Sequence, residues 1–140
     1  MEGYSTNDPL PIKNGLYVGH WTSWVIDEYS HTREKIGGQI EIELYEDPTT
    51  ERQWLGEMTV SGWDFFEGMV FDVRANAYLN TGSNRYTVNI LAEFAEDQFW
   101  LITSSELNPM NNTINGNFNL INKYDISPQG GLVEDLTYIN

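Results

Sequence analysis

The sequence contains no cysteine, and this absence removes several functions at the outset. Without thiols the chain forms no disulfide, holds no metal through thiolates and performs no thiol redox chemistry. It has only two histidines, so we also expect no zinc centre and no other metal site. A phosphate-cradling glycine loop, a Gly-x-Ser-x-Gly elbow and a His-Glu-x-x-His motif are all missing. We therefore expect no cofactor, and we assign no catalytic residue.

Positive charge is scarce. Seven Lys and Arg stand against 21 Asp and Glu, which gives a net charge of −14. Binding to phosphate usually needs clustered Lys and Arg, so we expect no nucleic acid and no anionic membrane as a partner. Strong acidity favours solubility, and it also fits a basic protein partner.

Long apolar runs are absent as well, since no segment approaches the roughly 18 apolar residues of a membrane span. The first 15 residues, "MEGYSTNDPLPIKNG", show neither a basic start nor an apolar stretch typical of a signal peptide. We expect a cytoplasmic protein; a secreted one would require that a signal peptide has been removed.

What the chain does have is alternation of apolar and polar residues, the pattern of half-buried strands. In "GQIEIELYE", Ile40, Ile42 and Leu44 share one face and the intervening polar residues share the other. Turn signals divide the chain into eight expected strands. These lie near 16–26, 39–46, 53–62, 65–77, 85–94, 98–104, 113–123 and 131–139. A short helical turn is conceivable over 27–35.

Glycines recur between large apolar residues on one face of these segments. The pattern is Tyr17-x-Gly19-x-Trp21, Trp54-x-Gly56-x-Met58, Phe66-x-Gly68-x-Val70 and Ile114-x-Gly116-x-Phe118. Inward glycines relieve crowding where strands coil into a closed barrel. The sequence thus predicts an all-β, up-and-down antiparallel barrel of about eight strands, with a β-sandwich as the alternative. One domain should span 1–140, with 1–14 as an irregular arm.

Gly19-His20-Trp21, preceded by Tyr17, resembles the Gly-x-Trp opening of lipocalins and fatty-acid-binding proteins, and it is also similar to that of avidin-type barrels. The lipocalin-like phycobiliprotein lyases begin with Gly-x-Trp-x-Ser, which Gly19, Trp21 and Ser23 match. Lipocalins tend to place an Arg near the last strand, where this chain offers only Lys123. The resemblance implies an internal cavity for a small, largely apolar ligand.

If the glycine register is inward, a set of large side chains converges on one interior. The candidate ligand-binding residues are Tyr17, Trp21, Trp54, Met58, Tyr86, Ile90 and Phe118. Such an interior either fills completely or leaves a narrow, aromatic-lined pocket at one mouth, and a pocket of this kind would hold a flat or hydrophobic ligand by buried area. The acidic surface would favour a neutral or cationic ligand over a carboxylate.

Other polar or exposed residues receive structural interpretations. We expect His20 to point outward, His31 to lie in a polar loop, and "EDPTTE" and "AED" to be turns rather than calcium sites. Asp72 and Arg74 share a strand face that we expect to point outward, where they could pair with each other or with Glu67.

Trp24 and Trp63 fall on the face opposite the glycines. An exposed Trp often marks an interface, so a homo-oligomer could form through these two residues.

Four functions remain open. The first is a non-catalytic barrel that binds a small apolar or aromatic ligand, and the second is an acidic module or inhibitor that binds a basic protein. The third is an enzyme of cyclase or isomerase type that uses the barrel cavity. The fourth is a carbohydrate-binding sandwich, in which aromatics would form an open row on one sheet.

Overall fold

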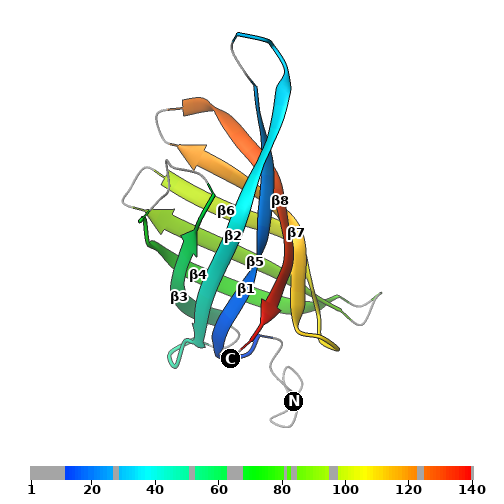
Figure 1. The fold of residues 1–140 in the computed structure, drawn as a ribbon. Coiled ribbons are helices and arrows are strands. Elements are labelled where there is room, and N and C mark those ends of the chain that lie inside the picture. Colours follow the sequence, from blue (N-terminus) through cyan, green and yellow to red (C-terminus); the bar gives the residue numbers. More distant parts are fainter. Residues whose placement is uncertain are drawn as a thin grey trace.

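A computed structural model describes residues 12–26, 29–50, 53–62, 68–80, 82, 85–94, 98–122 and 125–139. Eight antiparallel strands follow one another around a closed barrel, and β8 pairs back with β1 (Figure 1). Their bounds are β1 Gly15–Ile26, β2 Arg33–Glu46, β3 Gln53–Val60, β4 Phe71–Asn80, β5 Arg85–Phe94, β6 Gln98–Asn108, β7 Thr113–Asn122 and β8 Asp125–Tyr138. The predicted up-and-down barrel is confirmed, and the sandwich alternative is set aside.

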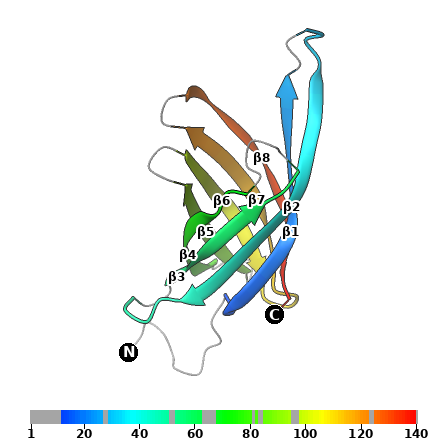
Figure 2. The same cartoon turned by 60° about the vertical axis from the view of Figure 1, so that its left-hand side comes forward.

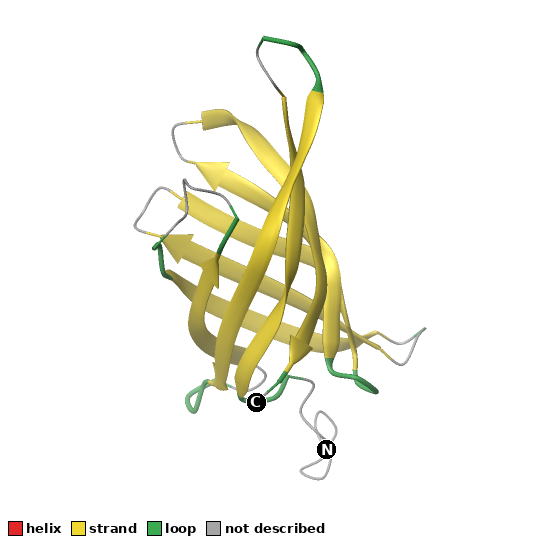
Figure 3. Ribbon diagram, viewed as in Figure 1, coloured by secondary structure: helices red, strands yellow, loops and turns green. Residues whose placement is uncertain are grey.

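The described residues are strands and short connections, with no helix among them (Figure 3). The helical turn suggested for 27–35 is wrong where the chain is described, because β2 already begins at Arg33. Backbone pairing explains the difference: β1 continues to Ile26 and pairs there with Arg33, so strand hydrogen bonding extends to the hairpin turn. Tyr29 and Ser30 form that turn.

Strand boundaries depart from the prediction in four other places. β4 begins at Phe71 instead of 65, and residues 63–67 lie outside the described chain. β4 continues to Asn80, β6 runs on to Asn108, and β8 starts as early as Asp125. In each of the three extensions a neighbouring strand supplies the ladder, as Asp125 pairs with Asn122 of β7.

Alternation sets which side chains fill the barrel. On β2, Ile40, Ile42 and Leu44 are all 0% exposed, whereas Glu43 between them is exposed. A one-residue slip would reverse both faces, so burial of the apolar set fixes the register. The core draws from every strand, and Ile12 from the segment before β1 joins it. The single-domain boundary of 1–140 and the arm of 1–14 stay predictions.

Two of the four predicted glycine positions show most clearly why a larger residue is excluded. A Cβ atom on Gly56 would collide with the carbonyl oxygen of Glu43 on β2, and one on Gly116 would collide with the Ser105 side chain on β6. Gly68 is different, and its assignment to a strand is wrong. It lies in a turn before β4 with φ of +81°, a backbone conformation that glycine tolerates best.

The first hairpin projects from one end of the barrel (Figures 1 and 2). β8 pairs with β1 only from Tyr17 to Ser23, while β1 and β2 stay paired as far as Ile26 and Arg33. The barrel wall therefore opens between β1 and β8 at this end.

Candidate functional site

The predicted ligand-binding residues all lie on the inner side of the wall. Six of them are almost completely buried, with at most 1% exposure: Tyr17, Trp21, Trp54, Met58, Ile90 and Phe118. Tyr86 is partly buried and packs against the same cluster. The structure thus brings the whole set together in one core. Whether these side chains contact a ligand stays a prediction.

Backbone pairing places several of them in one row that runs from strand to strand along the inner face of the barrel. Trp54 on β3 pairs with Ala75, which pairs with Ile90. The row continues through Ile102 to Phe118 on β7. Trp21 reaches the same row from β1, since its ring meets the Phe118 ring edge-on with centroids 6.3 Å apart.

Most polar atoms of this interior have partners within the protein. The Trp21 indole Nε1–H donates to the Ser61 carbonyl oxygen at 2.8 Å, and the Ser23 hydroxyl donates to the Gly130 carbonyl at 2.7 Å. The Tyr17 hydroxyl oxygen accepts the Lys13 backbone N–H at 2.8 Å. Burial raises the pKa of Tyr17 to about 12, so this phenol stays neutral at physiological pH.

Trp54 breaks this pattern. Its side chain is 0% exposed, and its Nε1 is buried without any hydrogen-bond partner. Within the described residues it is the only buried side-chain nitrogen or oxygen in this condition. Buried donors are nearly always paired, so a group of this kind asks for an explanation.

The wall beside Trp54 is built from small side chains. Ala75 directly opposes Trp54, and Ala77 and Ala92 also point inward from β4 and β5. Trp54 is followed two residues later by Gly56, which has no side chain. Alanine is the smallest apolar side chain, so these positions fill less of the interior than Leu or Phe would, in a barrel whose strand number suits one small ligand.

Asp72 and Arg74 point outward, as predicted. Both are exposed, and the Arg74 guanidinium pairs with Glu93 on β5, with Nη2 and Oε1 3.0 Å apart. Glu67, the alternative partner, lies outside the described residues. The ion pair is a surface contact across two strands.

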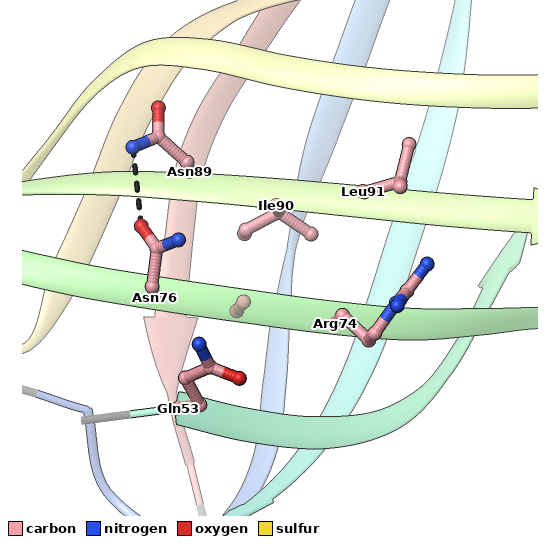
Figure 4. Close-up of a pocket in the computed structure, with 7 residues that line it drawn as sticks. Gln53, Arg74, Asn76, Asn89, Ile90 and Leu91 are labelled. Carbon is pink, nitrogen blue, oxygen red and sulfur yellow. Dashed lines mark hydrogen bonds between the residues drawn. The ribbon is translucent and has the colours of Figure 1, made fainter. Parts of the chain in front are cut away.

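A hollow of about 250 Å³ lies on this outer wall, over the Ala75–Ile90 pair (Figure 4). Gln53, Asn76 and Asn89 line one side, and the Asn89 amide donates to Asn76 at 3.2 Å. The sequence did not predict this hollow. Three amide residues, Gln53, Asn76 and Asn89, are its only sign in the sequence, and their alignment depends on strand register.

Trp24 lies outside the barrel at the base of the projecting hairpin, as predicted, and is 38% exposed. Arg33 and Lys35 approach its ring, each with its charged group 5.7 Å from a ring centroid. A second hollow of about 360 Å³ lies here, between Trp24 and Leu132. Trp63 lies outside the described chain, and a homo-oligomer through these tryptophans stays a prediction.

Neither histidine lies in the interior: His20 is exposed on β1, and His31 is exposed beside the hairpin turn. The proposed turn at "EDPTTE" is closed by Asp47, whose Oδ1 accepts both the backbone N–H and the hydroxyl of Thr49, at 2.9 and 2.7 Å. These bonds lower the pKa of Asp47. The "AED" turn lies outside the described residues. No group of three potential metal-ligating side chains occurs among the residues placed by the structure.

The fold and interior define a small closed antiparallel β-barrel with a largely apolar, aromatic core. Among the residues that the structure describes, no helix is long and apolar enough to cross a membrane. Comparison with protein-family models, with curated proteins and with solved structures gave no match. The likeness to lipocalin-type barrels therefore stays an expectation from the Gly19 and Trp21 motif.

Proposed function

We propose that the chain is a non-catalytic barrel that binds one small apolar or aromatic ligand, neutral or cationic, inside the barrel beside Trp54. The observation that carries this proposal is the unpartnered Trp54 Nε1, fully buried in a core whose other described buried side-chain polar atoms are satisfied. A ligand would supply the missing partner. The inward alanines and the buried aromatic side chains support it, because a ligand beside Trp54 would contact small and aromatic apolar side chains.

Filling the interior beside Trp54 tests this proposal. Ala75 is 5% exposed and opposes Trp54, whereas the next residue, Asn76, points outward on the same strand. Intrinsic tryptophan fluorescence is titrated with neutral aromatic probes such as naphthalene derivatives. We expect Ala75→Leu to remove the response and Asn76→Leu to retain it, with circular dichroism showing that both variants are folded.

The proposal fails if the wild type binds no neutral or cationic aromatic probe. It also fails if folded Ala75→Leu and Asn76→Leu bind the probes equally, because the site would then lie outside the barrel.

A second candidate function, binding of a basic protein, is favoured by a row of carboxylates on the outer wall. Register partners from β2 to β5 form this row: Glu43, Glu57, Asp72 and Glu93. Like charges that oppose each other on neighbouring strands are destabilising, and a basic partner would relieve this repulsion. The double variant Glu57→Gln/Asp72→Asn, which removes two of these negative charges, should then weaken binding of a lysine-rich peptide. Binding to the wild type should fall steeply with salt. Equal affinity for variant and wild type would dismiss this candidate.

A further inference from the structure

Among the described side chains of the interior, only Trp54 has a buried nitrogen or oxygen without a hydrogen-bond partner. Its position is fixed on both sides, because β3 pairs Trp54 with Glu46 of β2 and with Ala75 of β4. The Trp21 indole, equally buried, is occupied by the Ser61 carbonyl. The Trp54 N–H is therefore available for a hydrogen bond.

The chemistry of the indole limits which group can accept this hydrogen bond. An indole N–H only donates, so its partner must present an acceptor atom. An ammonium group has only donors, so it cannot accept a hydrogen bond from the indole N–H. A carboxylate would lose its hydration in a core whose described buried residues are apolar apart from Ser23, Ser105 and Thr113. A neutral acceptor avoids both costs.

We infer that the barrel selects a neutral ligand with an apolar body and one acceptor oxygen, such as a ketone, ester or ether, and that the Trp54 Nε1–H donates to that oxygen. This inference rests on the proposed function and narrows it. The aromatic rings supply most of the contact area, and the single donor sets the orientation of the ligand. Trp54 thus acts as the specificity-determining residue.

A pair of near-isosteric probes tests the inference. 2-Acetylnaphthalene has a carbonyl oxygen where 2-isopropylnaphthalene has a methyl group. Their affinities are measured by calorimetry for the wild type, for Trp54→Phe and for the control Trp24→Phe, which changes a tryptophan outside the barrel. A hydrogen bond in a buried site changes affinity by roughly fivefold. We expect the ketone-to-hydrocarbon affinity ratio to fall roughly fivefold in Trp54→Phe and to stay at the wild-type value in Trp24→Phe.

The outcomes distinguish failure of the proposed function from failure of the narrower inference about Trp54. If neither probe binds the wild type, the proposed function fails. If both bind and the ratio is the same in wild type and Trp54→Phe, the interior site stands and the inference is overturned, with the N–H served by a water molecule.

A measurement on the wild type alone covers the case in which Trp54→Phe does not fold. The infrared carbonyl stretch of bound 2-acetylnaphthalene should lie below its frequency in hexane, because hydrogen bonding weakens the C=O bond. A bound carbonyl with the hexane frequency overturns the inference.

Discussion

Two tryptophans of the same interior, Trp21 and Trp54, are equally buried but differ in the hydrogen bonding of their indole N–H groups. Both are 0% exposed, and both flank a glycine in the same sequence pattern. The Trp21 N–H is bound to Ser61, whereas the Trp54 N–H has no partner. Burial alone thus does not distinguish the two tryptophans, but the hydrogen bonding of their indole N–H groups does.

The largest expected effect breaks the comparison by disrupting the wall that supports both tryptophans. Gly56→Val and Gly116→Val should each cost about 2 kcal/mol or more in free energy of unfolding, through overpacking and strain. At Gly56 the obstacle is the Glu43 backbone, which side-chain rotation cannot relieve. Urea denaturation measures the loss. Thr59→Val, an exposed position on the same strand, serves as the control and should stay close to wild type. Wild-type midpoints for both glycine variants would mean that the inner register is wrong.

A smaller effect sharpens the comparison directly. Trp21→Phe removes a satisfied hydrogen bond, whereas Trp54→Phe removes a donor that had none. Both lose a similar ring volume, so the difference between the two reports mainly the hydrogen bond. We expect Trp21→Phe to be more destabilising by about 1.5 kcal/mol in ligand-free protein. Equal losses in thermal or urea melts would remove the distinction between the two tryptophans.

The smallest expected effect concerns Tyr17, whose hydroxyl accepts a hydrogen bond from the Lys13 backbone N–H, and it appears only at alkaline pH. Its folded pKa is about 12, above the unfolded value of 10.0, so burial favours the neutral phenol. The resulting stability is fully present below pH 10 and should be lost as pH rises from 10 towards 12.

Urea melts across this range test the prediction. Tyr17→Phe should flatten the alkaline decline relative to wild type. Tyr29→Phe, at a side chain that is 97% exposed, should not. An unchanged decline in Tyr17→Phe would contradict the assigned burial of the phenol.

The sequence made the barrel predictable because period-two alternation and inward glycines are local signals. It placed all seven candidate residues on the inner side for the same reason. The partner of an indole N–H is different, because Ser61 lies 40 residues from Trp21 and meets it only through the barrel. No spacing in the sequence separates Trp21 from Trp54. The Arg74–Glu93 pair and the outer amide hollow likewise depend on the register between β4 and β5.

Gly68 shows the opposite failure. It carries the same flanking pattern as Gly56 but lies in a turn, because positive φ and strand bending both call for glycine. The motif alone does not tell these two uses apart.

We propose that Trp54, and not Trp21, offers an unpartnered donor to a ligand. Nitrogen-15 NMR of the indole groups tests it most directly, with resonances assigned from the two Trp→Phe variants. We predict that the Trp54 indole proton moves downfield when 2-acetylnaphthalene is added and stays in place with 2-isopropylnaphthalene. The Trp21 proton, already bonded to Ser61, should keep its hydrogen-bonded shift with both. A Trp54 proton that is already downfield in ligand-free protein, and does not move with the ketone, would contradict the account.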